Sequence, residues 1–117
     1  AMMSSVLVSP HGYYEYEAAH GTVQRHYYKY LKGEKTSTNP IATIFAWSGA
    51  LKKRGELDGN AALMNYADKL EEASLAVIES GLMTGDLAAI STLPDIKTLD
   101  SESFIKAIRA KLAELLA

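Results

Sequence analysis

A short segment near the N-terminus, residues 18–26 (AAHGTVQRH), contains the residue types from which anion sites are built. It leaves a predicted strand, passes through a glycine and enters the first turn of a predicted helix. The backbone N–H groups of residues 21–23 would be unpaired at that helix start and could donate to a phosphate. Arg25 and His26 follow in the first turn, from which their side chains can reach a second anionic group. The alternative is that Thr22 is an ordinary helix cap and Arg25 a solvated charge.

Two other features of this region have simpler explanations. Asn39 followed by Pro40 is typical of a helix start, with Asn39 as the cap and Pro40 at the first helical position. His11 stands in a predicted turn and is expected to be solvated, and His20 lies in a loop, where a histidine is more often structural than catalytic. No metalloprotease, P-loop, dinucleotide-fingerprint or nucleophile-elbow motif occurs, and the acids are scattered. We therefore expect no metal site made wholly from this chain.

The composition is that of one soluble globular unit. The chain has 117 residues, 48% of them hydrophobic, and no cysteine. This excludes a disulfide scaffold and a thiolate metal site, and it suits a reducing compartment. No apolar run approaches the about 18 residues that a membrane span requires, and the opening does not resemble a signal peptide. We therefore expect neither a membrane protein nor a disordered tail.

Charge is distributed unevenly along the chain. Residues 20–54 hold seven basic and one acidic side chains, a net charge of +6, so the remainder carries −8 within the total of −2. All three histidines and six of the seven tyrosines fall within the first 30 residues. The acidic isoelectric point of about 5.9 argues against a nucleic-acid partner. The informative chemistry is therefore N-terminal.

The elements that must position this chemistry are a hairpin and a helix. Residues 4–9 and 13–17, joined by turn residues 10–12, predict a β-hairpin whose glutamates share one face. From Thr22 the period becomes that of a helix, which Gly33 would end. The apolar face of this helix comprises Val23, Tyr27, Tyr30 and Leu31.

The rest of the chain is predicted to be helical. Helices are expected over residues 40–55, 60–81 and 84–90, followed by a terminal helix capped by Asp100 or Ser101. We interpret the apolar stripes of all these helices as core. Because two strands give the helices little sheet to cover, the chain is expected to be either a helical bundle or a piece of a larger domain.

Residues 17–47, EAAHGTVQRHYYKYLKGEKTSTNPIATIFAW, resemble the coenzyme-binding stretch of the dimeric NADP-dependent isocitrate dehydrogenases, members of the β-decarboxylating dehydrogenase family. The similarity continues through KLEEAS (69–74), IESGLMTGDLAA (78–89) and the terminal helix. It covers essentially the whole chain. The HGT loop and TSTNPIA at this separation mark the family, and the RH pair narrows the resemblance to this class.

The resemblance implies an α/β parent fold of the isocitrate/isopropylmalate dehydrogenase type. Residues 1–117 would be the C-terminal segment of its large, coenzyme-binding domain, a single unit that is mostly α-helical with an N-terminal β-hairpin. The residues implied to contact NADP are His20, Gly21, Thr22, Val23, Gln24, Arg25, His26, Thr38 and Asn39.

The resemblance also implies separate roles for these residues. Arg25 and His26 would lie on the adenosine 2′-phosphate, His20 beside the adenine, and Thr38 with Asn39 at the adenine edge. The residue at position 24, a glutamine, stands where relatives carry threonine. Because that contact is largely made by the backbone, the substitution puts little in doubt.

For the complete enzyme the resemblance implies oxidation of isocitrate and metal-assisted loss of CO₂ to give 2-oxoglutarate, a step of the tricarboxylic acid cycle. The ligands of Mg²⁺ or Mn²⁺ and the proton-transfer groups would lie N-terminal to Ala1, so we expect no catalytic residue in this chain and no activity from it alone. A homodimer in the cytoplasm, or in mitochondria of a eukaryote, is also implied.

Two alternatives remain open. One is another β-decarboxylating dehydrogenase, such as an isopropylmalate or homoisocitrate dehydrogenase, although members that use NAD are not expected to place Arg25 and His26 together after HGTV. The other is a non-catalytic helical interaction module whose basic stretch binds an acidic partner or nucleic acid.

Overall fold

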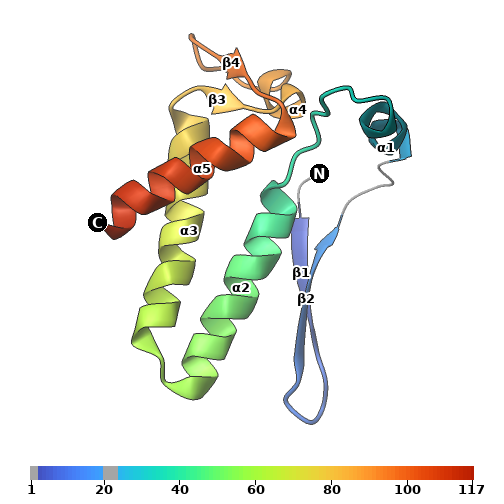
Figure 1. The fold of residues 1–117 in the computed structure, drawn as a ribbon. Coiled ribbons are helices and arrows are strands. Elements are labelled where there is room, and N and C mark those ends of the chain that lie inside the picture. The colour runs from blue at the N-terminus through green and yellow to red at the C-terminus, as the bar shows by residue number, and fades with distance from the viewer. Residues whose placement is uncertain (1–2, 20–23) are drawn as a thin grey trace.

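The computed structural model describes residues 3–19 and 24–117 and shows a long hairpin beside a group of helices (Figure 1). The elements are β1 (Met3–Val8), β2 (Tyr14–Ala19), α1 (Gln24–Leu31), α2 (Ile41–Asp58), α3 (Ala61–Glu79), β3 (Leu82–Met83), α4 (Gly85–Ala88), β4 (Lys97–Thr98) and α5 (Ser101–Leu116). The expected class for this piece, mostly helical with an N-terminal β-hairpin, is confirmed. Within these residues no helix combines the length and the hydropathy needed to cross a bilayer.

The hairpin forms as its sequence predicts. β1 and β2 pair antiparallel, with Val8 opposite Tyr14, and the turn contains Gly12 at φ 83°, a left-handed conformation that glycine adopts readily. Because side chains alternate along a strand, Glu15 and Glu17 share one face, and both are exposed.

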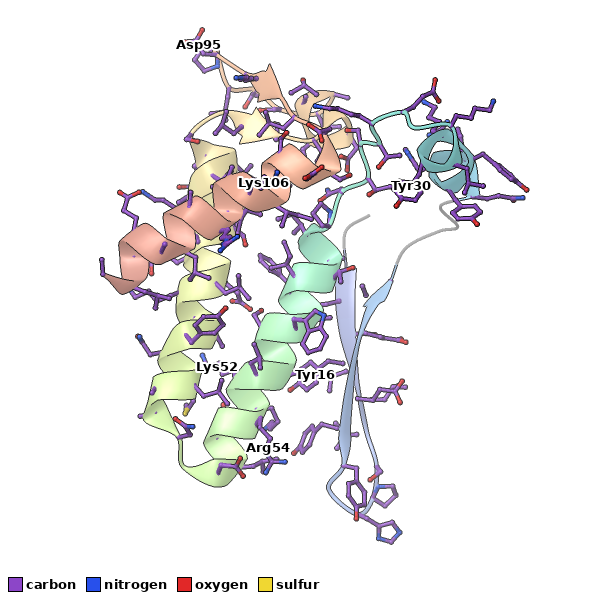
Figure 2. All side chains as sticks on the ribbon, in the orientation of Figure 1. Tyr16, Tyr30, Lys52, Arg54, Asp95 and Lys106 are labelled. Atoms are coloured by element: carbon purple, nitrogen blue, oxygen red, sulfur yellow. The ribbon has the colours of Figure 1, made fainter. Side chains whose placement is uncertain are left out.

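The other face of the hairpin packs on α2. The half-buried Tyr16 ring lies between β2 and α2 (Figure 2). A Cβ at Gly49 would come within 2.8 Å of that ring, so only a glycine permits this approach. Nearby, Lys53 Nζ lies 4.6 Å from the centroid of the Tyr14 ring.

The core lies among α2, α3 and α5. α2 and α3 run side by side in opposite directions, and α5 packs across α3 (Figure 1). Asn60 caps α3 by accepting a hydrogen bond from Leu63 N at 3.1 Å, and Gly81 at φ 96° follows its end, as predicted. The buried core residues are Ile41, Ala73, Val77, Phe104, Ile108 and Leu112.

The two ends of α2 differ from the prediction. Pro40 occupies the cap position, and Asn39 caps from one residue further back, its Oδ1 accepting from Ile41 N at 3.0 Å. The helix does not end at Gly55, which is buried within it, where a Cβ would lie 2.7 Å from Met64 Cγ. The glycine therefore serves helix packing, and the left-handed residue that ends α2 is Gly59 at φ 64°.

Two further expectations are corrected, and one small sheet was not expected. The stripe on α1 is not core: α1 has no buried residue, and Tyr27, Tyr30 and Leu31 are exposed. The helix expected over residues 84–90 is shorter than predicted, because α4 spans only Gly85–Ala88. The parallel pair of two-residue strands, β3 and β4, was not predicted, because strands this short leave no periodic pattern.

Candidate functional site

Nine residues were expected to contact a coenzyme, and four of them lie outside the described residues: His20, Gly21, Thr22 and Val23. The described backbone stops at Ala19, the end of β2, and resumes at Gln24, the start of α1. Anion binding by backbone amides of this loop therefore stays a prediction. The other five residues divide between the first turn of α1 and the segment before α2.

The first turn of α1 presents Gln24, Arg25 and His26. Gln24 Nε2 donates to Tyr28 Oη at 3.3 Å, one helical turn further on. Arg25 is exposed and makes no ion pair within residues 3–19 and 24–117. A positive charge at the start of a helix is not favoured by the helix dipole, so the structure of α1 does not explain Arg25.

His26 carries a polar atom that has no partner in the described part of the chain. The side chain is half-buried, and its Nδ1 is removed from solvent without a hydrogen bond to any described group. An unpaired buried polar atom costs about 1–3 kcal/mol. The imidazole therefore keeps a hydrogen-bonding capacity that no described group uses, and together with the exposed cation of Arg25 it is a candidate anion contact.

Thr38 is held by the start of α5. Its Oγ1 lies 2.9 Å from Ser101 Oγ, and Ser101 Oγ donates to the carbonyl oxygen of Thr38 at 2.8 Å. Ser101 N also donates to the carbonyl oxygen of Thr36 at 2.9 Å. The segment formed by residues 36–39 is thus fixed by a residue more than sixty positions later in the chain.

Asn39 is held by the start of α4. Its Nδ2 donates to Asp86 Oδ2 at 2.9 Å, while Thr84 Oγ1, fully buried, donates to Asp86 Oδ1 at 2.6 Å. Partial burial would raise the pKa of Asp86, but the hydrogen bonds from Thr84, Asn39 and backbone N–H groups outweigh it and hold the pKa below its ordinary value of 3.8. The ionised carboxylate therefore orients the Asn39 amide.

The sequence did not indicate these supporting residues. Thr84 and Ser101 were assigned only to helix starts, and Asp86 was not singled out. Thr84 followed by Asp86 is a local signal for a hydroxyl–carboxylate bond at a helix start. The partners of Asp86 and Ser101 in segment 36–39 are distant in sequence, and nothing local identifies them.

A cavity of about 600 Å³ adjoins this segment, between the end of α1 and the first turns of α5. Thr36 and Ser101 both line it, and Tyr30 closes the side formed by α1. Its volume is within the range of about 300–1,000 Å³ that small-molecule sites occupy. Its charged lining comprises Glu34, Lys35, Asp100, Glu102, Lys106 and Arg109.

The charged lining of the cavity is partly paired. Lys106 Nζ lies 2.8 Å from Glu102 Oε1, and this hydrogen bond raises the pKa of Lys106 and lowers that of Glu102. A search of residues 3–19 and 24–117 as a whole finds no group of three or more acidic, histidine or cysteine side chains that could hold a metal ion.

Comparisons with known proteins agree on one family of dehydrogenases. The family model described as "Isocitrate/isopropylmalate dehydrogenase" matches residues 1–108. The chain is 50% identical over 117 residues to isocitrate dehydrogenase (NADP) 1 of Mycobacterium tuberculosis strain H37Rv, covering 99% of this chain and 28% of that protein. Similar values hold for the cytosolic enzyme of Arabidopsis thaliana, 50% identical over 98% of this chain and 29% of the relative.

The mitochondrial isocitrate dehydrogenase (NADP) of Saccharomyces cerevisiae is 51% identical over 95% of this chain and 27% of its own length. The chain thus spans little more than a quarter of the length of the curated relatives that it matches.

Proposed function

The chain belongs to the isocitrate/isopropylmalate dehydrogenase family, and from that membership we propose that it is the NADP-binding portion of an NADP-dependent isocitrate dehydrogenase. Residues 1–117 would be the C-terminal segment of the large domain. The complete enzyme would oxidise isocitrate and release CO₂ to give 2-oxoglutarate. The relatives named above are NADP isocitrate dehydrogenases, which favours this substrate over isopropylmalate or homoisocitrate.

The observation that carries the proposal is the pair formed by Arg25 and His26. Arg25 has no ion-pair partner and His26 Nδ1 has no hydrogen-bond partner among the described residues. NADP has a 2′-phosphate where NAD has a hydroxyl, and a guanidinium can bind that phosphate through two parallel hydrogen bonds. Both side chains therefore fit a group that only NADP possesses.

In this mechanism the chain binds and orients the coenzyme. When bound, the coenzyme would supply the hydride acceptor for the secondary alcohol of isocitrate. Arg25 and His26 hold the 2′-phosphate and so select NADP over NAD, while Thr38 and Asn39 hold the adenine edge. Asp86 keeps the Asn39 amide in one orientation through the 2.9 Å hydrogen bond.

The metal ion of the complete enzyme is assigned to other parts of the protein. We propose, as the resemblance to the dimeric isocitrate dehydrogenases implies, that Mg²⁺ or Mn²⁺ is bound by residues outside this chain. We also propose that the complete enzyme is a homodimer and works in the cytoplasm, or in mitochondria of a eukaryote. Relatives with cytosolic and mitochondrial names support the last point.

A chimeric enzyme tests the proposal. Residues 1–117 replace the matching stretch of the Mycobacterium tuberculosis relative, to which they are 50% identical, and the relative supplies the rest of the enzyme. We expect NADP-dependent isocitrate oxidation by the chimera. Arg25→Ala should weaken NADP binding by about ten- to a hundredfold, because a charge-assisted phosphate contact is lost, and leave NAD nearly unaffected.

His26→Ala provides a second arm of the same test. His26→Ala should also weaken NADP binding more than NAD binding, because the imidazole is proposed to contact the same 2′-phosphate. Lys53→Ala, which removes a cation from α2 far along the chain from α1, is the control for nonspecific charge effects. Equal losses for NAD and NADP in Arg25→Ala would contradict the assignment of the pair to the 2′-phosphate.

A further inference from the structure

Ser101 fixes the direction in which the Thr38 hydroxyl can hydrogen-bond. Ser101 Oγ is within hydrogen-bond distance of two oxygen atoms of Thr38, the carbonyl oxygen at 2.8 Å and Oγ1 at 2.9 Å. A serine hydroxyl has one proton, and a carbonyl oxygen can only accept. Ser101 must therefore donate to the carbonyl, and the Thr38 hydroxyl must donate to Ser101 Oγ. The hydroxyl proton of Thr38 is therefore already used in the bond to Ser101, and Thr38 Oγ1 can only accept a hydrogen bond from a ligand.

Two further hydrogen bonds hold segment 36–39 against the start of α5. Ser101 N donates to the Thr36 carbonyl oxygen at 2.9 Å, which keeps the start of α5 and segment 36–39 in register. Ser37 Oγ donates to the Leu99 carbonyl oxygen at 3.4 Å. Both Thr38 and Ser101 are at least partly buried, so water does not readily replace these bonds.

We propose that Ser101 is a positioning residue that makes Thr38 Oγ1 an obligate hydrogen-bond acceptor and so sets a preference for a 6-amino purine over a 6-oxo purine. This inference rests on the proposed function, in which Thr38 meets the adenine edge of the coenzyme. The 6-amino group of adenine donates hydrogen bonds and matches a fixed acceptor. The 6-oxo group of hypoxanthine is itself an acceptor, and it would face the lone pairs of Oγ1 without a proton between the two oxygens.

The test compares NADP with its hypoxanthine analogue in the chimeric enzyme. The measured quantity is the ratio of kcat/KM for NADP to kcat/KM for the analogue. In Ser101→Ala the Thr38 proton is released, so the hydroxyl can rotate and donate to the 6-oxo group. We expect the ratio to fall by about tenfold, the size expected when one unmatched hydrogen-bonding pair is relieved.

Two matched variants isolate the hydroxyl. Ser101→Thr keeps an Oγ at the same position and should retain the ratio of the unchanged chimera. Ser103→Ala removes a hydroxyl from the same turn of α5, but that hydroxyl bonds to Asp100 within the helix, so the ratio should not change.

A third variant keeps the proposal testable if Ser101→Ala does not fold. Thr38→Val has nearly the same shape as the natural residue and lacks the acceptor oxygen, so it too should lower the ratio. Circular dichroism establishes folding before each kinetic comparison.

The outcomes separate this inference from the proposed function. An unchanged ratio in folded Ser101→Ala or Thr38→Val overturns the inference, as does an equal loss of activity with both coenzymes, which would indicate a merely structural role. These results leave the NADP preference of the chimera intact. A chimera that does not prefer NADP to NAD would instead contradict the proposed function itself.

Discussion

Two regions of the molecule bury their apolar side chains to very different extents. One is the helical group formed by α2, α3 and α5, and the other is formed by the hairpin and α1. In the helical group, Phe104 and Ala73 are 0% exposed and lie in a closed core. In the hairpin, Leu7 and Val8 are 58% and 57% exposed, and α1 has no buried residue. The basic and aromatic residues of the proposed coenzyme contact belong to the second region.

We infer from this contrast that the helical group provides most of the folding stability, while the hairpin and α1 provide the residues for coenzyme specificity. The helical group buries enough apolar surface for changes there to alter the free energy of unfolding. α1 buries little, so replacing Arg25 or His26 should alter ligand affinity with little effect on folding. Segment 36–39 lies between α1 and α2 in the chain, and hydrogen bonds hold it to the starts of α4 and α5.

The largest effect on stability is expected from Phe104→Ala. Removing a fully buried aromatic ring leaves a cavity in the core and should lower the free energy of unfolding by about 3–5 kcal/mol. Urea unfolding followed by circular dichroism measures the loss. Ile105→Ala is the control, because Ile105 is 48% exposed on the same helix. Equal losses for the two variants would remove the distinction between core and surface on α5.

A somewhat smaller loss is expected from Gly81→Ala. Gly81 has φ 96°, and a Cβ there would lie 2.3 Å from the Asp95 carbonyl oxygen, so the backbone must shift as well as bear strain. We expect a loss of about 3 kcal/mol, against about 1–2 kcal/mol for Gly59→Ala. Gly59 has φ 64° with nothing within 4 Å of the added atom. The free energies of unfolding in urea measure both losses, and the larger loss at Gly81 would reflect the collision together with its more strained φ.

Asp86 should make a small, pH-dependent contribution. Its pKa is lower in the folded protein than its ordinary value of 3.8, so its stabilisation is present above that value and is lost as pH falls through the folded pKa. Because the carboxylate is largely exposed, we expect less than about 1 kcal/mol. Asp86→Asn should therefore flatten the acid side of the stability profile measured between about pH 2 and 6.

A control for Asp86 is available at its hydroxyl partner. Thr84→Ser retains the donor and should keep the acid-side slope of the unchanged chain. A steeper slope in Asp86→Asn than in the unchanged chain would contradict the lowered pKa.

The smallest effect on stability is expected on the exposed hairpin. Leu7→Ser should change the free energy of unfolding by less than about 0.5 kcal/mol, since Leu7 is already 58% exposed. It should nevertheless reduce binding of the dye ANS and concentration-dependent association in sedimentation, because exposed apolar surface promotes both. A strictly monomeric, ANS-negative unchanged chain would show that this surface is not available.

Features governed by short stretches of sequence could be predicted before the structure. Asn60 caps α3 and Gly81 follows its end because capping depends on one side chain and a few neighbouring backbone groups. The spacing of Phe104, Ile108 and Leu112 placed them on one buried face of α5 for the same reason. The hairpin and its turn are likewise local.

Only the tertiary structure decided which of these faces is covered. The stripe of α1 has the same helical spacing as that of α5, yet it is exposed, because burial depends on what lies opposite a face. Gly55 was misread as a helix end because a glycine that permits close packing against Met64 has the same sequence signature.

In the candidate site, too, the local features could be predicted from the sequence and the long-range contacts could not. The residue types and positions of Arg25 and His26 were sufficient to suggest an anion contact, because both lie in the first turn of a helix. The hydrogen bonds of Thr38 to Ser101 and of Asn39 to Asp86 join residues 63 and 47 positions apart. Pairings at such separations depend on how the helices pack, so local sequence could not specify which hydroxyl or carboxylate orients the site.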